Sequence, residues 1–154
     1  MQTTFTIQTN GQGLYEFTDQ VVSWVRGSGV LTLFIQHTSA SILVQEKADP
    51  QVRTDLTNYF SRLVPPANDP TMHYLTHRYE GDDDMPAHIK SAMLPVSIQI
   101  PVIEGRMALG TWQGIYLFEH RDAPHHAHVR ETDIHVRVHH AVEHLGNGRF
   151  GYHS

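Results

Sequence analysis

The chain has 154 residues, a mass of 17.5 kDa and a formal net charge of −5. This length fits one domain, and the negative charge disfavours a general nucleic-acid binder, which carries a basic surface. The absence of cysteine excludes disulfides, thiolate metal sites and cysteine nucleophiles. Because the chain has neither a signal-peptide pattern nor an apolar run of roughly 20 residues, we expect a cytoplasmic protein.

The first half of the chain predicts short strands followed by a long helix. Alternating or continuous apolar residues predict strands at 5–9, 30–36 and 41–45. Thr18 is suited to cap a short helix over residues 19–26. Asp49 and Pro50 have the residue types of a helix start, and the apolar positions that follow predict a helix that ends before Val64-Pro65-Pro66.

The second half begins with a polar stretch, residues 67–85, that predicts a long loop. Asp84 is suited to cap a third helix, which runs to Met93 and is ended by Pro95. Strands are predicted at 96–103, 106–119 and 134–138, with a hairpin turn at Glu104-Gly105. Together these elements indicate a single-domain α+β fold, with an antiparallel or mixed sandwich or barrel-like sheet and about three helices. Residues 143–154 are expected to form a flexible tail.

Thirteen histidines are an unusual number for this length, and they point to metal binding or acid–base chemistry. The alternative is that many are solvated surface residues. That alternative is favoured for five in the C-terminal part, His125, His126, His128, His139 and His140.

Two clusters of polar residues flank the strand at 41–45. His37, Thr38 and Ser39 stand on a short connection between two strands, where they could offer hydrogen-bond donors to an anion or simply bond to the turn itself. Glu46 stands where that strand ends and a helix is about to begin. It could act as a base or a metal ligand, although a charge at a helix entry is the commoner explanation.

A third cluster runs from His77 to Lys90. Asp84 and His88 are four residues apart at a helix start, so both can face one point, and His77 comes from the preceding loop. Imidazole and carboxylate groups together are ligands for a divalent ion. Three adjacent acids, residues 82–84, repel one another unless a cation or a helix terminus offsets them.

A fourth cluster contains Trp112 and Gln113 between two glycines, followed by Glu119 and Arg121. Glycines within a strand pattern indicate a bulge or a close backbone approach. Trp112 could be a core aromatic residue, whereas a buried Gln113 would need hydrogen-bond partners. The chain has no Walker loop, dinucleotide fingerprint, HExxH motif or nucleophile elbow.

In this order the four clusters resemble the YjbQ family of small bacterial and archaeal proteins. The segments that carry the resemblance are HTSAS with Glu46, ADPQVRTDL, HRYEGDDDMPAHIKSAML and GRMALGTWQGIYLFEHR, within residues 4–121. The family is often labelled secondary thiamine-phosphate synthase. The resemblance implies a transferase that joins a pyrimidine diphosphate to a thiazole phosphate, and a homotrimer. The chain departs from the family in the His-rich stretch DAPHHAHVRETD, where relatives have a glycine- and arginine-rich turn.

On this interpretation each site residue receives an expected role. The catalytic residues are His37, Ser39, Glu46 and Gln113. The residues expected to contact a small phosphorylated substrate are Thr38, Lys90, Trp112 and Arg121. The ligands of a divalent ion, Mg²⁺ or Zn²⁺, are His77, Asp84 and His88. Two alternatives stay open: a metal-dependent hydrolase of a small phosphorylated metabolite, and a non-catalytic metal or metabolite binder.

Overall fold

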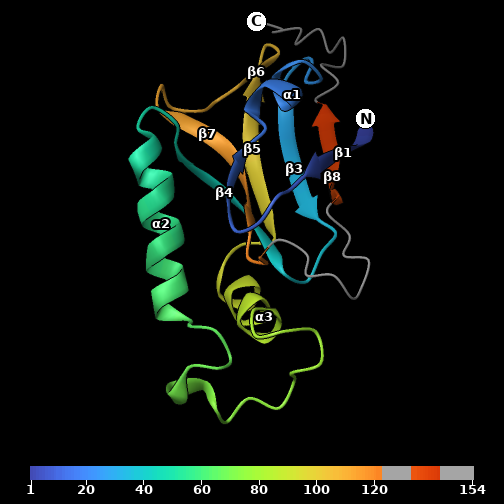
Figure 1. Ribbon diagram of the computed structural model, residues 1–154. Coiled ribbons are helices and arrows are strands. Elements are labelled where there is room, and N and C mark those ends of the chain that lie inside the picture. The colour runs from blue at the N-terminus through green and yellow to red at the C-terminus, as the bar shows by residue number, and fades with distance from the viewer. Residues whose placement is uncertain (123–132, 143–154) are drawn as a thin grey trace, which may run out of the picture.

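In the computed structural model, which describes residues 1–122 and 133–142, two antiparallel sheets form one α+β domain (Figure 1). The first sheet has the order β1 (Gln2–Gln8), β8 (Asp133–Val142), β3 (Gly29–Ile35), β5 (Ser97–Ile103) and β6 (Arg106–Met107). The second has the order β2 (Gly13–Glu16), β7 (Gln113–Glu119) and β4 (Ala40–Glu46). The predicted fold class is therefore confirmed.

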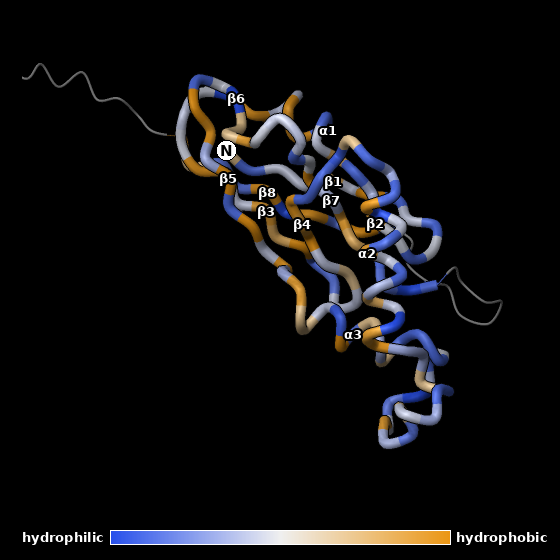
Figure 2. Tube along the Cα trace, turned by 90° about the vertical axis from the view of Figure 1, so that its left-hand side faces the viewer, coloured by the Kyte–Doolittle hydropathy of each residue, from blue (hydrophilic) through white to orange (hydrophobic). Residues whose placement is uncertain are grey.

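The core lies between the two sheets. Alternate residues of β3 and β8 point inward, and apolar residues of β4 and β7 meet them from the other sheet, as Leu31, Val136, Ile42 and Leu117 illustrate. Each of these four side chains is almost completely buried, as expected when each sheet turns one face to the core. Figure 2 shows the hydrophobic residues concentrated along the strands.

Three helices are found in the described part of the chain: α1 (Thr18–Val22), α2 (Pro50–Leu63) and α3 (Asp84–Met93). Leu56 and Phe60 of α2 pack on Tyr116 and Phe118, so α2 covers the outer face of the three-stranded sheet. α3 lies at one end of the sheets, where Ser91 donates a hydrogen bond to the carbonyl of Ala40. A polar loop with a short 3₁₀ turn at Pro70–Met72 joins α2 to α3.

Local signals predicted two features closely. Asp49 accepts a hydrogen bond from the backbone N–H of Gln51 at 2.9 Å and caps α2 as expected. Glu104 and Gly105 form the turn between β5 and β6, and both have positive φ, which two-residue hairpin turns require. Both features depend on residues adjacent in sequence.

Two predicted caps are wrong. Thr18 is the first residue of α1 rather than its cap, and its hydroxyl bonds to Glu16 and to the N–H of Ile115. Asp84 lies inside the first turn of α3, where its carboxylate binds other side chains. In both cases a long-range partner takes the side chain that a local pattern assigned to the helix.

The prediction also missed β2 and the burial of His140, whereas His139 is exposed as expected. β2 has four residues, GLYE, which are too few to show alternation. His139 and His140 lie in β8, which is longer than expected, and His140 is fully buried rather than solvated. His125, His126, His128 and the predicted tail at 143–154 lie outside the described residues. Within those residues, no helix has both the length and the apolar character to cross a membrane.

Candidate metal centre

Three elements meet at one end of the molecule. The connection between β3 and β4, the end of β7 and the start of α3 all lie where Ala40 pairs with Glu119, and we call this the histidine end. The opposite end of the same two strands, where Glu46 pairs with Gln113, is called the tryptophan end. Six residues of extended strand separate the two ends by about 20 Å.

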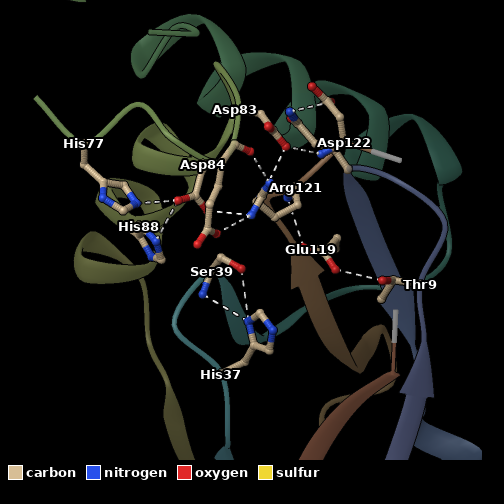
Figure 3. A network of polar contacts seen from close by, with 12 residues as sticks. Thr9, His37, Ser39, His77, Asp83, Asp84, His88, Glu119, Arg121 and Asp122 are labelled. Carbon is tan, nitrogen blue, oxygen red and sulfur yellow. Dashed lines mark hydrogen bonds and ion pairs between the residues drawn. The ribbon is translucent and has the colours of Figure 1, made fainter. Parts of the chain in front are cut away.

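Asp84 is the centre of the histidine end (Figure 3). Its side chain is 1% exposed. The Oδ2 atom lies 2.7 Å from His77 Nε2 and 3.3 Å from His88 Nε2, while Oδ1 lies 2.5 Å from Arg121 Nη1. The ligand atoms of the two histidines and Asp84 all lie within 4.8 Å of one another. The structure thus brings together the three residues for which metal ligation was predicted.

The contact of His88 with the backbone fixes the orientation of its ring. His88 Nδ1 lies 2.8 Å from the carbonyl oxygen of Thr38. A carbonyl oxygen only accepts hydrogen bonds, so Nδ1 carries the proton. In neutral His88 the lone pair of Nε2 then faces Asp84 Oδ2, which is itself an acceptor. Only a proton on Nε2 or a cation between the two atoms makes this contact attractive.

Arg121 fixes the acidic side of the centre. Its guanidinium bonds to Asp83 Oδ2 through Nε at 2.9 Å, to Asp84 through Nη1, and to the Glu80 carbonyl through Nη2 at 2.9 Å. Burial opposes the charge of Arg121, yet these acidic neighbours outweigh it and raise the pKa of the guanidinium. Arg121 therefore offsets the repulsion expected within the acidic run.

Asp83 is bound from two sides. Besides Arg121 Nε, the backbone N–H of Asp122 donates to Asp83 Oδ2 at 2.8 Å. Burial alone would raise the pKa of Asp83, but these two donors lower it. Asp83 is consequently held as a carboxylate and does not cap α3 with its side chain.

Glu119 connects this network to β1. It is fully buried, its Oε1 accepts from the N–H of Arg121 at 3.0 Å, and its Oε2 accepts from the hydroxyl of Thr9 at 2.7 Å. Thr9 is more than a hundred positions away in sequence, so spacing along the chain could not reveal this pair. The network positions Arg121, which in turn orients Asp84.

His37 and Ser39 lie beside the centre. The N–H of Ser39 donates to His37 Nδ1 at 3.2 Å, and Ser39 Oγ lies 3.0 Å from the same atom. Thr38 stands between them and holds His88 through its carbonyl. Of the residues predicted to be catalytic or substrate-binding, the structure therefore places His37, Thr38, Ser39 and Arg121 at the histidine end.

The remaining predicted site residues lie elsewhere. Glu46, Trp112 and Gln113 are at the tryptophan end, so Glu46 does not complete the group formed by the two histidines and Asp84. Trp112 is 64% exposed rather than part of the core. Gln113 Oε1 accepts from the N–H of Gly110 at 2.7 Å and stabilises its own turn. Gly114 brings the backbone of β7 close to Glu16 and Lys47, because a Cβ here would meet Glu16 Oε2 at 2.9 Å.

Lys90 is almost completely buried rather than exposed to a phosphate in solvent. Burial lowers the pKa of its ammonium, against the opposing charges of Asp122 and Asp83. His120 is also fully buried and bonds to Ser41 Oγ through Nε2 at 2.9 Å. No local pattern indicated this pair, because a histidine that follows a strand is usually solvated.

Comparison with known proteins decides the family. The profile of the family described as "UPF0047 protein YjbQ-like" matches residues 3–142. The chain belongs to this family.

Curated relatives from two bacteria support the assignment. The UPF0047 protein of Synechocystis is 46% identical over 134 residues, which are 84% of this chain and 86% of that protein. The UPF0047 protein YjbQ of Escherichia coli O157:H7 is 43% identical over 125 residues, 78% of this chain and 87% of the relative.

Solved structures show the same fold. A Clostridium acetobutylicum protein, titled an uncharacterized conserved protein of the yjbq/upf0047 family, aligns with a TM-score of 0.74 at 28% identity, over 90% of this chain and 99% of its own. A conserved hypothetical protein from Thermus thermophilus aligns with a TM-score of 0.74 at 27% identity, with the same coverages of 90% and 99%.

These relatives correct the functional prediction. Their names and titles describe UPF0047, uncharacterized or hypothetical proteins and state no thiamine-phosphate synthase, hydrolase or metabolite-binding activity. The expected pyrimidine–thiazole transfer and the alternative of a metal-dependent hydrolase are therefore wrong as functions assigned through the family. The resemblance in sequence motifs identified the family correctly but did not establish an activity.

Proposed function

We propose that this protein binds a divalent transition-metal ion through His77 Nε2, Asp84 Oδ2 and His88 Nε2. The observation that supports this most strongly is the orientation of His88. Because its Nδ1–H is held by the Thr38 carbonyl, its lone pair is aimed at a carboxylate oxygen 3.3 Å away. A ring nitrogen bound to a backbone carbonyl is the usual arrangement around histidine ligands of a metal.

The spacing of Asp84 Oδ2 from the two histidine nitrogens supports this proposal, and all three ligand atoms lie within 4.8 Å of one another. A tetrahedral ion with bonds of about 2.1 Å places its ligand atoms about 3.4 Å apart. The two distances from Asp84 Oδ2, 2.7 Å and 3.3 Å, need only small side-chain movements to reach that value. Two imidazoles and one carboxylate favour Zn²⁺ or a similar ion over Mg²⁺, which prefers oxygen ligands.

The surroundings define what such an ion can do. Arg121 holds Asp84 Oδ1, so the carboxylate offers the ion one oxygen. Three protein ligands leave at least one position open for a water molecule or an external ligand. The His77 side chain is 43% exposed and that of His88 30%, so solvent reaches the group from the histidine side.

Metal titration of the chelator-treated protein tests the proposal. His88→Ala should weaken Zn²⁺ binding by more than about a hundredfold, since ligand loss exceeds the effect of outer contacts. His73→Ala is the control, because it removes an exposed imidazole from the loop that carries His77. Replacing His125, His126 and His128 with glutamine in every protein keeps the His-rich stretch from contributing. Equal affinities of the His88 and His73 variants would overturn the proposal.

The homotrimer and the cytoplasmic location also stay proposals. The first is supported by the resemblance to the YjbQ family and the second by the composition of the chain. Light scattering of the purified protein measures the assembly directly, and a monomer at all concentrations would contradict the trimer.

A further inference from the structure

The two oxygens of the Asp84 carboxylate have different partners. Oδ1 accepts a hydrogen bond from Arg121 Nη1 at 2.5 Å (Figure 3). Oδ2 faces His77 Nε2 at 2.7 Å and His88 Nε2 at 3.3 Å. One oxygen is therefore bound to a guanidinium, and the other is directed at the two imidazoles.

The guanidinium of Arg121 is fixed by contacts that do not involve the three metal-ligating residues. Its Nε donates to Asp83 Oδ2 at 2.9 Å, and its Nη2 donates to the carbonyl of Glu80 at 2.9 Å. The backbone N–H of Arg121 donates to Oε1 of buried Glu119 at 3.0 Å. Turning the guanidinium away from Asp84 would also break its bonds to Asp83 and Glu80, so Oδ1 stays occupied.

This arrangement restricts how Asp84 can bind a cation. A carboxylate ligates an ion through one oxygen or through both, and ions that take many oxygen ligands often use both. An ion that approached Asp84 Oδ1 would also approach the positive charge of Arg121, which repels it. The centre thus offers two imidazole nitrogens and a single oxygen, a set that suits an ion of low coordination number.

On the basis of the proposed metal centre, we propose that Arg121 makes this centre selective for small four-coordinate ions such as Zn²⁺ and Co²⁺ over Mn²⁺, because it withholds the second oxygen of Asp84. Arg121 acts through Asp84 and is a positioning residue. Without it, Asp84 is free to turn and offer both oxygens, which suits Mn²⁺ because that ion favours carboxylate and water ligands in octahedral geometry. Most sites prefer Zn²⁺ to Mn²⁺ in any case, so the contribution of Arg121 is a larger ratio between the two affinities.

A ratio of affinities separates the geometry of Asp84 from the charge of Arg121. Removing the guanidinium also removes a positive charge beside the ion, which strengthens the binding of every divalent cation by a similar factor. That factor cancels when the Kd of Mn²⁺ is divided by the Kd of Zn²⁺. A change in this ratio therefore reports how the carboxylate is presented.

Arg121→Met tests the selectivity in the chelator-treated protein that carries the three glutamine substitutions of the titration above. We expect the ratio of Kd values, Mn²⁺ over Zn²⁺, to fall by about tenfold or more, as is usual when an outer contact of a ligand is lost. Co²⁺ gives a second readout, because its visible absorption is strong in four-coordinate sites and weak in six-coordinate ones. This absorption should weaken in the variant. Arg53→Met at the tryptophan end is the control and should leave the ratio and the Co²⁺ spectrum unchanged.

An unchanged ratio and an unchanged Co²⁺ spectrum in folded Arg121→Met protein would overturn the selectivity proposal and leave the metal centre in place. Equal Zn²⁺ affinities of the His88→Ala and His73→Ala proteins would overturn both. If circular dichroism shows that the methionine variant is unfolded, Arg121→Lys decides. Its single ammonium keeps the charge but cannot hold Asp83 and Asp84 together as the planar guanidinium does, so the ratio should again fall, and an unchanged ratio would contradict the proposal.

Discussion

The histidine end and the tryptophan end are the two ends of one strand pair, β4 and β7, yet they have different chemistry. At the histidine end, buried Glu119 and Asp84 are connected through Arg121, with two histidines directed at Asp84. At the tryptophan end, Trp112 is exposed and Gln113 bonds to its own turn. Two polar motifs that look alike in sequence therefore have different roles. One forms a network of paired charged side chains, and the other stabilises its own turn.

The largest expected difference between the two ends concerns the dependence of folding stability on pH. Burial, with the nearby charge of Lys90, lowers the pKa of His120 at the histidine end to about 3. The unfolded chain takes up this proton below its ordinary pKa of 6.5 and the folded chain does not. Stability is therefore fully present above that value and falls as the pH drops toward about 3, by about 3 kcal/mol between pH 7 and pH 4.

Urea unfolding at pH 7 and pH 4 measures this loss. His120→Phe removes one of two buried histidines with a lowered pKa and should reduce the pH dependence of the unfolding free energy, whatever the substitution costs at pH 7. Burial also lowers the pKa of His140, which therefore keeps part of the dependence. The lowered pKa of Asp83 adds a loss in the same direction, confined to pH values near and below 3.8. If the His120 variant kept the slope of the unmodified protein between pH 7 and pH 4, the buried histidine would not be its source.

A smaller effect is expected from Arg121→Met. This substitution leaves the carboxylates of Asp83 and Asp84 without their cation, so we expect the free energy of unfolding to fall by about 2–3 kcal/mol. The loss is moderated because the arginine side chain is 16% exposed. Arg53→Met at the tryptophan end, where the guanidinium lies 5.8 Å from the centre of the Tyr116 ring, should cost less than about 1 kcal/mol. Equal losses would remove the distinction between the ends.

The smallest effect belongs to the cap of α2, near the tryptophan end. Asp49→Ala deletes the side-chain bond to the N–H of Gln51 and should cost about 1 kcal/mol in urea unfolding. Asp49→Asn keeps an acceptor and should restore most of it. A loss that asparagine does not restore would mean that Asp49 acts through its charge rather than as a cap.

Sequence reasoning succeeded where a signal was local. The spacing of four residues between Asp84 and His88 placed both on one side of a helix start, and the structure confirms that their side chains meet. The turn at Glu104-Gly105 and the start of α2 were predicted for the same reason. Residues that are near in sequence have few alternative geometries.

Sequence reasoning failed where a partner came from a distant part of the chain. Nothing near Glu119 indicated that Thr9 binds it, and nothing near His88 indicated that the carbonyl of Thr38 orients it. The two ends were also treated as one site, because motif order does not say at which end of a strand a residue lies. Glu46 and Glu119 are carboxylates on paired strands, but the register places them at opposite ends.

The most direct test of the metal centre is X-ray diffraction at the zinc absorption edge on crystals of the Zn²⁺-loaded protein. We predict one anomalous peak with His77 Nε2, Asp84 Oδ2 and His88 Nε2 each at about 2.0–2.2 Å, while His88 Nδ1 stays on the carbonyl of Thr38. A zinc ion bound only by other residues, with His77 and His88 still in direct contact with Asp84, would contradict the account.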